Sequence, residues 1–306
     1  MLCFGVTHTN SSHPHSWRLI DVLSAATEYL AKNNIDSARL NAERLLAHVL
    51  GITRVDLYLR YAQPLTETER DALKDLLRRR ASCEPLQYIL GETEFMSLPF
   101  RVTPDVLIPR PETEILVERA IDWIRSSRKE GEDLTCLDIG TGSGAIAVSL
   151  AYLCPALQVW AVDKEASALD VTRQNAETNS VIERIRIIQL DAEQPDFSQK
   201  LERRFDIVVS NPPYVSRIEL ESLQTEIREH EPRAALDGGE DGLRFYRALA
   251  MFLPTILNPS GRCFLEIGAT QAETVSRILL AHHTWTIEVI QDLAGMDRVL
   301  ALSNQM

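Results

Sequence analysis

Hydrophobic positions follow two different periods along the chain. Between residues 17 and 84 they recur every three or four positions, which is the spacing of one face of an amphipathic helix. From residue 134 onward, short apolar runs alternate with helical stretches. We expect strands at 134–139, 157–162, 185–190, 205–210 and 262–267, then near 285–290 and 297–302, and helices near 145–153, 166–179, 242–257 and 269–282. Strands that alternate with helices predict an α/β fold with a mainly parallel, doubly wound sheet.

The helical stretch at 17–84 predicts a small N-terminal domain without catalytic residues of its own. One apolar face ends at Gly51, and Thr66 with Glu69 forms a capping-box pattern at the start of a further helix. The run Arg78–Arg80 indicates a solvated helix end, where cations complement the helix dipole. We expect this domain to recruit the substrate. Residues 1–16, which are polar and contain three histidines, are expected to form a disordered tail.

A linker and a stiffened helix start separate the two parts. Two short alternating runs around a turn near Ser97 predict a β-hairpin linker over 85–106. Residues 107–114 follow with the sequence LIPRPETE, in which two prolines restrict the backbone before a helix that continues to Ile124. The sheet domain is expected to cover 107–306.

Composition and charge exclude several classes of protein. With 306 residues, 45% of them hydrophobic, the chain is long enough for two domains. The net charge of −12 opposes a general nucleic-acid binder, because phosphate binding relies on clustered Lys and Arg. No apolar stretch approaches the ~20 residues of a membrane span, and no secretion signal is evident. The five scattered cysteines indicate reduced thiols of a cytoplasmic protein, with neither a disulfide framework nor a metal site.

The strand expected at 205–210 ends in Asn211-Pro212-Pro213-Tyr214. Two consecutive prolines hold the backbone extended just beyond the carboxyl end of the strand, where open α/β sheets bind ligands. The Asn211 side chain and the Pro212 carbonyl each offer an acceptor oxygen, so a planar NH2 group could donate one hydrogen to each while Tyr214 stacks on its face. This element resembles the signature of methyltransferases that modify amino groups conjugated to a carbonyl or a ring.

Three neighbouring strand ends carry the groups of a nucleotide-like cofactor site. The first is followed by Gly140-Thr141-Gly142-Ser143-Gly144, whose glycines permit a tight turn and whose free amides point outward at a helix start. Asp163 ends the next strand, where its carboxylate could hold both ribose hydroxyls. Asp191 ends the third strand and could reach an adenine amino group. Together they indicate an S-adenosylmethionine pocket, in which the acids also suit a cationic sulfonium.

From Trp17 onward the chain resembles the release-factor glutamine methyltransferase (HemK/PrmC) family. The distinctive stretches are PLQYILG, LIPRPETE, the glycine loop, NPPYV and HEPRAALDGGEDGLRFY, at 85–91, 107–114, 140–144, 211–215 and 230–246. The resemblance implies a Rossmann-like sheet of seven strands and a small N-terminal helical domain. It also implies transfer of a methyl group from S-adenosylmethionine to the side-chain nitrogen (N5) of the glutamine in the Gly-Gly-Gln loop of class I peptide-chain release factors.

The resemblance assigns roles to individual residues. Asn211, Pro212 and Tyr214 would be catalytic and, with Pro213, would hold the glutamine. The cofactor would be bound by Gly140, Thr141, Gly142, Ser143, Gly144 and Asp163. We add Asp191, because of its place at the third strand end, and Asn211 to the expected cofactor site. The chain departs from the family pattern at Ala192, a position where an aromatic side chain often packs on adenine.

Two other functions remain open at this point. An amino-methyltransferase acting on adenine or cytosine of nucleic acid would use the same acceptors, although the acidic charge and the missing basic segment oppose it. A cofactor-binding scaffold without activity would explain the glycine loop but not the complete Asn211–Tyr214 element. We expect a cytoplasmic monomer that binds release factors. We expect it neither to form a stable complex with nucleic acid nor to associate with a membrane.

Overall fold

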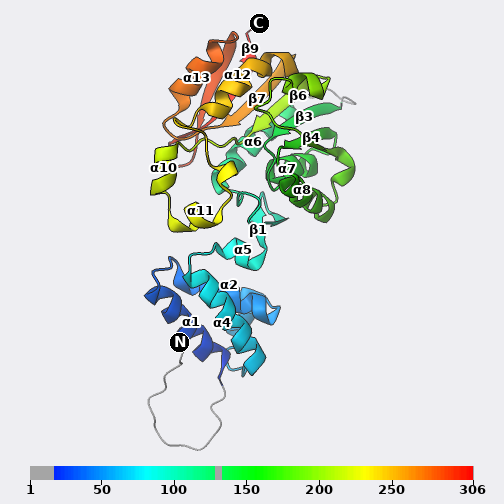
Figure 1. Cartoon of the computed structure of the whole chain (residues 1–306). Helices are drawn as coiled ribbons and strands as arrows, with labels where there is room; N and C mark the ends of the chain where they lie inside the picture. Colours follow the sequence, from blue (N-terminus) through cyan, green and yellow to red (C-terminus); the bar gives the residue numbers. More distant parts are fainter. Residues whose placement is uncertain (1–16, 128–132, 306) are drawn as a thin grey trace, which may run out of the picture. The chain divides into compact units, whose positions relative to one another are not determined.

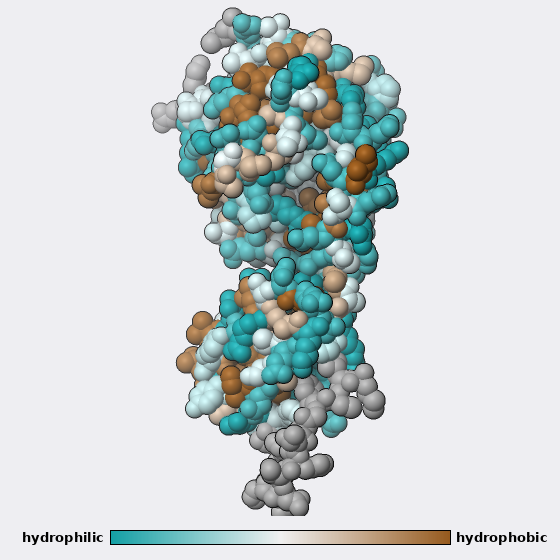
Figure 2. All heavy atoms as spheres, turned by 90° about the vertical axis from the view of Figure 1, so that its left-hand side faces the viewer, coloured by the Kyte–Doolittle hydropathy of each residue, from teal (hydrophilic) through white to brown (hydrophobic). Residues whose placement is uncertain are grey.

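The computed structural model describes residues 17–127 and 133–305. The chain divides between Leu90 and Gly91 into two compact units, which are described separately (Figure 1). The tail expected at 1–16 lies outside the described residues. Among those residues, no helix combines the length and the apolar character needed to cross a bilayer, and hydrophilic side chains cover most of the face in Figure 2.

The first unit is built from helices around one core. Its helices are α1 (Leu19–Lys32), α2 (Ala38–Leu50), α3 (Arg54–Leu59), α4 (Glu67–Ala81) and α5 (Leu86–Leu90). The core contains apolar residues that recur at helical spacing along α1 and α2: Leu19, Val22, Leu23, Ala26, Leu30, Leu45 and Leu46. The capping box at the start of α4 is confirmed, since Thr66 accepts from the Glu69 amide and Glu69 from the Thr66 amide. The expectation of a solvated helix end is wrong for Arg80, which is 5% exposed and donates to Asn41 and to the Glu84 carbonyl.

The second unit contains the predicted sheet. Its seven strands lie in the order β5-β4-β3-β6-β7-β9-β8. The first five of that order are parallel, and β9 pairs antiparallel with both of its neighbours. The strands are β3 (Leu134–Ile139), β4 (Leu157–Asp163), β5 (Ile185–Gln189), β6 (Phe205–Ser210), β7 (Leu257–Glu266), β8 (Trp285–Gln291) and β9 (Asp297–Asn304). The mainly parallel sheet of seven strands is confirmed.

Strand order places a ligand site between β3 and β6. The chain runs outward from β3 to β4 and β5 and then returns to the other side of β3 as β6. Such a reversal leaves a crevice at the carboxyl ends of the two central strands. The residues that follow β3, β4 and β6 are those that sequence analysis singled out.

Helices cover both faces of the sheet, which explains the run of three consecutive apolar residues, Ile207–Val209, in β6. Ile207 and Val209 lie in the core on one face, and Val208 lies in the core on the other. One core also contains residues of α6 (Pro111–Ser127) and α7 (Ala145–Leu153). The other contains residues of α9 (Phe197–Leu201), α12 (Arg244–Ile256) and α13 (Ala272–Leu280). The remaining elements are α8 (Ala166–Thr178), α10 (Arg217–Ser222), α11 (Thr225–His230) and two short 3-10 turns at Ile182–Arg184 and Arg233–Ala235.

The predicted hairpin packs on the second unit. It consists of β1 (Glu92–Phe95) and β2 (Leu98–Arg101), and Phe95, Leu98 and Phe100 are buried in the core beside α6 and α7. Asn175 of α8, which is fully buried, accepts from the Arg101 amide and donates to the Arg101 carbonyl and to the Ser143 carbonyl. One side chain therefore fastens the hairpin and the glycine loop to the same helix.

We expect Asn175→Ala to destabilise the second unit. Three backbone polar groups lose their partner, and each unpaired buried group costs roughly 1–3 kcal/mol. Urea unfolding should show a clear fall of the midpoint, whereas Glu177→Ala, an exposed change on the same helix, should leave it nearly unchanged. Equal midpoints for the two variants would contradict the fastening role.

Candidate active site

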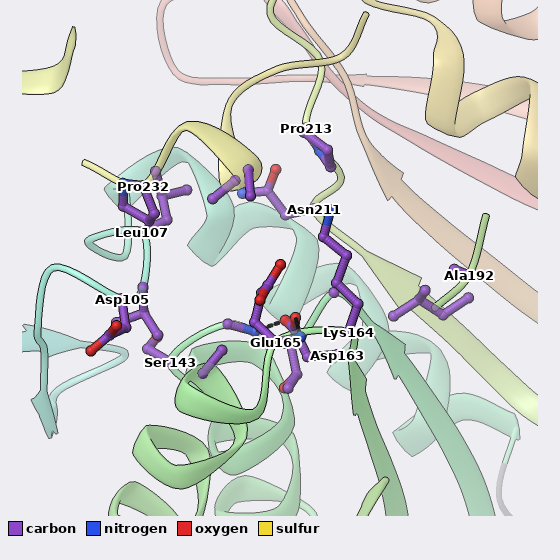
Figure 3. Close-up of a pocket in the computed structure, with 18 of the residues that line it drawn as sticks. Asp105, Leu107, Ser143, Asp163, Lys164, Glu165, Ala192, Asn211, Pro213 and Pro232 are labelled. Atoms are coloured by element: carbon purple, nitrogen blue, oxygen red, sulfur yellow. Dashed lines mark hydrogen bonds between the residues drawn. The ribbon is translucent and has the colours of Figure 1, made fainter. Parts of the chain in front are cut away.

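A cavity of about 310 Å³ lies at the carboxyl ends of β3, β4 and β6 (Figure 3). Its volume falls at the lower end of the range of roughly 300–1,000 Å³ that is usual for small-ligand sites. All of its lining residues belong to the second unit. In the view of Figure 3, Asn211 enters from above and Asp163 lies below it.

The glycine loop is held in place from two sides. Below it, the buried Asp138 accepts a hydrogen bond from the Thr141 hydroxyl at 2.7 Å. Burial raises the pKa of Asp138 to about 7, although the Thr141 hydrogen bond opposes the shift. From α8, the Thr172 hydroxyl donates to the Gly142 carbonyl at 2.9 Å. Gly144 has φ +79°, and a Cβ there would lie 3.0 Å from the Thr172 methyl, so glycine is needed where the loop enters α7.

Asp163 is fixed by backbone amides at the edge of the cavity. Its two oxygens accept from the Gly142 and Glu165 amides at 2.9 and 3.0 Å, the interactions dashed in Figure 3. Burial raises the pKa of this carboxyl, and the two amide hydrogen bonds oppose that shift. Each carboxylate oxygen retains a second lone pair for a ligand hydroxyl.

Asp191 and the residues after it form another wall. The Asp191 oxygens accept from the Glu193 amide at 2.9 Å and from the Gln194 side chain at 3.0 Å. Partial burial opposes its ionisation, but the hydrogen bonds from Gln194 and Glu193 prevail and lower its pKa. Ala192 lines the cavity as expected of its position. An aromatic ring is present nonetheless, because Phe245 of α12 also lines the cavity. Sequence reasoning missed Phe245, although it lies inside the distinctive stretch at 230–246.

Two backbone carbonyls of the segment after β6 are committed to hydrogen bonds. The Tyr214 carbonyl accepts from the Gln271 side chain at 3.0 Å, and the Val215 carbonyl accepts from the Gly238 amide at 2.8 Å. A Cβ on Gly238 would lie 2.8 Å from the Pro213 oxygen, so a glycine is needed at this close approach. Within the described part of the chain, no donor reaches the carbonyl of Pro212.

An ion pair joins the two stretches that border the cavity near Asn211. Arg110, between the two prolines of LIPRPETE, donates to Glu231 at 2.6 Å, and the Glu231 side chain is only 2% exposed. Burial raises the pKa of Glu231, and the Arg110 charge opposes the shift. This pairing explains the unusual Pro-Arg-Pro start of α6.

The predicted site residues divide into two groups. Those that line the cavity are Gly140, Thr141, Gly142, Ser143, Asp163, Asp191, Asn211 and Pro213. Gly144, Pro212 and Tyr214 belong to the same segments but are not among the lining residues. The Tyr214 ring packs against the core that contains α12, and its hydroxyl donates to Glu266 at 3.3 Å. Stacking of this ring on a substrate amide stays a prediction.

The chemical character of the cavity fits S-adenosylmethionine. The glycine loop offers backbone at close range, Asp163 offers acceptors for hydroxyls, and Phe245, Ala192 and Ile139 offer apolar surface. Five carboxylates and three cations line the cavity, which suits a ligand with net positive charge: Asp105, Asp163, Glu165, Asp191 and Glu193 against Arg110, Lys164 and Arg244.

Comparison with known proteins defines the class. Residues 123–240 match the family described as the methyltransferase small domain. The fold is shared with the hMettl16 catalytic domain, solved in complex with MAT2A 3'UTR hairpin 6, with a TM-score of 0.53 and 18% identity over 76% of this chain and 83% of that one. The protein is therefore a methyltransferase, and S-adenosylmethionine is its cofactor.

Relatives that match along nearly the whole chain define the family. Residues 21–91 match the PrmC N-terminal domain. The release factor glutamine methyltransferase of Geobacter sulfurreducens is 44% identical over 287 residues, which cover 94% of this chain and 97% of that protein. The enzyme of the same name from Chlorobaculum tepidum is 40% identical over 290 residues, covering 94% and 98%. The chain belongs to the release factor glutamine methyltransferase family, as the sequence motifs predicted.

We expect Asp163→Ala to weaken S-adenosylmethionine binding by about 10- to 100-fold, because each hydrogen bond to a charged group contributes roughly 1.5–3 kcal/mol. Isothermal titration calorimetry measures the dissociation constant directly. Asp170→Asn on the exposed side of α8 removes the same charge and should change the affinity little. An unchanged dissociation constant for Asp163→Ala would remove this residue from the cofactor site.

Proposed function

We propose that this protein transfers a methyl group from S-adenosylmethionine to the side-chain amide nitrogen (N5) of the glutamine in the Gly-Gly-Gln loop of class I peptide-chain release factors. Family membership supports the reaction and the class of substrate. The structural observation that supports the proposal is that Asn211 lines the cavity, and that the carbonyl of the next residue, Pro212, accepts no hydrogen bond from the described residues. The two oxygens together match the two hydrogens of an amide NH2 group.

The cofactor would be held by residues of the first three strand ends. We assign the glycine loop Gly140–Gly144 to close contact with the cofactor, Asp163 to its ribose hydroxyls and Asp191 to its adenine amino group. S-adenosylmethionine supplies an electrophilic methyl group. The excess of carboxylates around the cavity favours binding of its sulfonium.

Catalysis by this site is mainly alignment. An amide nitrogen is a poor nucleophile because its lone pair is delocalised into the carbonyl, and it needs no general base before it is methylated. Hydrogen bonds from the NH2 group to Asn211 and Pro212 would orient the nitrogen and favour lone-pair character on it. Holding two reactants in line can contribute roughly 7–11 kcal/mol. We assign to Tyr214 the stacking on the flat face of the substrate amide that its place after the two prolines predicts.

The same two acceptors select glutamine against glutamate. A carboxylate offers only oxygens, so Asn211 and Pro212 would both be left unpaired in a site that excludes water. Each unpaired acceptor costs roughly 1–3 kcal/mol. Selectivity for an amide and orientation of its nitrogen therefore depend on the same contacts.

Nucleic acid as the alternative substrate is not favoured by the comparisons, because the relatives matched over nearly the whole chain are named for release factors. We propose that the helical unit, which matches the PrmC N-terminal domain, recruits the release factor. We further propose a cytoplasmic monomer. The described cysteines are all free thiols, in keeping with a reducing compartment.

The decisive experiment is methyl transfer from labelled S-adenosylmethionine to a purified class I release factor. The Gln→Ala variant of its Gly-Gly-Gln loop, duplex DNA and tRNA serve as parallel substrates. We expect label on the unchanged release factor alone. Label on nucleic acid alone would mean that the Asn211–Tyr214 element accepts a base amino group, and the proposed substrate would be wrong.

Asn211→Ala should reduce turnover by about 100-fold or more while leaving cofactor affinity within about threefold, because it removes an acceptor that orients the reacting nitrogen. Single-turnover rates and calorimetry measure the two effects separately. Gln291→Ala, which removes an exposed amide on β8, should behave as the unchanged protein does. Turnover of Asn211→Ala near that of the unchanged protein would refute the role.

A further inference from the structure

A chain of hydrogen bonds runs from Asn211 into the interior of the second unit. The Asn211 side-chain nitrogen donates to the Thr113 hydroxyl at 3.1 Å. The Thr113 hydroxyl donates in turn to one oxygen of Glu266 at 2.6 Å, and the Tyr214 hydroxyl donates to the other at 3.3 Å. Thr113 and Glu266 are 4% and 1% exposed. Neither of these two buried residues was singled out by sequence analysis.

The number of hydrogens on each group fixes the direction of these hydrogen bonds. A hydroxyl has one hydrogen, and an ionised carboxylate can only accept. Thr113 therefore spends its hydrogen on Glu266 and presents only lone pairs to Asn211. The Asn211 amide must meet those lone pairs with its NH2 group, which leaves its oxygen on the other side. The residue lines the cavity, so that oxygen is the atom available to a substrate.

We propose that Thr113 and Glu266 are positioning residues that keep the acceptor oxygen of Asn211 toward the substrate and so set the preference for glutamine over glutamate. The inference rests on the proposed function, because it explains how that function's amide selectivity is maintained. An asparagine without this anchor can turn its amide by half a revolution. It would then offer a donor, which suits a carboxylate and repels an NH2 group.

Polar and charged groups from several elements surround Glu266. Tyr214 and Thr113 donate to its carboxylate, and Tyr246 of α12 donates to its backbone carbonyl at 2.7 Å. Arg298 of β9, which also pairs with Asp292 at 3.1 Å, supplies a positive charge, and Glu112 supplies a negative one. Burial raises the pKa of Glu266 to about 7, while the Thr113 hydrogen bond and the Arg298 charge oppose the shift.

Protonation of Glu266 would reverse the hydrogen-bond chain. A neutral carboxyl can donate to Thr113, whose hydrogen is then free for the Asn211 oxygen, and the Asn211 NH2 group would turn toward the substrate. The ionised form is the competent one, so kcat/KM should rise with pH through about 7. Below that value it should fall about tenfold per pH unit.

The test compares binding of two full-length release factors, one with Gln and one with Glu in the Gly-Gly-Gln loop, to the full-length methyltransferase. S-adenosylhomocysteine is present so that no transfer occurs. The unchanged protein should prefer Gln, and Thr113→Val should reduce the ratio of the two affinities by roughly tenfold, the worth of about one hydrogen bond. Thr113→Ser keeps the hydroxyl and should restore the ratio. A ratio that Thr113→Val leaves unchanged overturns the inference.

Two controls separate misfolding and a wrong function from a wrong inference. Thr113→Val should keep its unfolding midpoint within a few degrees and should keep its affinity for S-adenosylhomocysteine. If both are kept and the ratio of the Gln to the Glu release-factor affinity still falls, the loss is one of positioning and not of folding. The second measurement is the pH profile of kcat/KM, in which Glu266→Gln should abolish the limb near pH 7. A limb with the same midpoint and height in Glu266→Gln as in the unchanged protein contradicts the role of Glu266 and would be assigned to Asp138, whose pKa is also about 7. An unchanged protein that methylates no release factor overturns the proposed function and this inference with it.

Discussion

The structure depends on keeping the end of β6 rigid while leaving the Pro212 carbonyl uncommitted. Pro212 and Pro213 have no amide hydrogens, so the segment cannot be held by ladder hydrogen bonds of its own. Its rigidity comes from neighbours that bind its other groups. The Gln271 side chain donates to the Tyr214 carbonyl. The Val215 amide donates to the Leu236 carbonyl, and the Val215 carbonyl accepts from the Gly238 amide. The two acceptors of the proposed reaction, the Asn211 side-chain oxygen and the Pro212 carbonyl, are left without a donor from the described residues.

The distinctive stretches of the sequence act as supports for one another. LIPRPETE supplies Arg110, which pairs with Glu231, and Thr113, which bonds to Asn211. The stretch at 230–246 supplies Glu231 in return, together with Gly238 close to Pro213. Considered alone, neither stretch gives a reason for its unusual residues. Their unusual residues are explained by the contacts that the two stretches make with each other and with the end of β6.

Sequence alone predicted the strands well and the contacts between distant segments poorly. The run at 205–210 was found because a strand buried on both faces is rich in apolar residues, and the glycine loop because its spacing is local. Thr113 and Glu266 could not be found this way, since 153 positions separate them and each has an ordinary local explanation as a helix-start or strand-end residue. Arg80 was misjudged for the same reason, because its partner Asn41 lies 39 positions away. Phe245 was missed because an aromatic wall was expected directly after Asp191.

Selectivity between an amide and an acid is a matter of hydrogen placement, and a single asparagine does not provide it. An asparagine side chain has nearly the same shape in both orientations of its amide, so packing alone holds neither. A fixed orientation needs a partner that can only accept, and a hydroxyl becomes such a partner only when something else takes its hydrogen. A buried carboxylate does so, and placing it behind Thr113 keeps its negative charge out of the cavity. The acid that defines the acceptor is therefore one that the substrate does not touch.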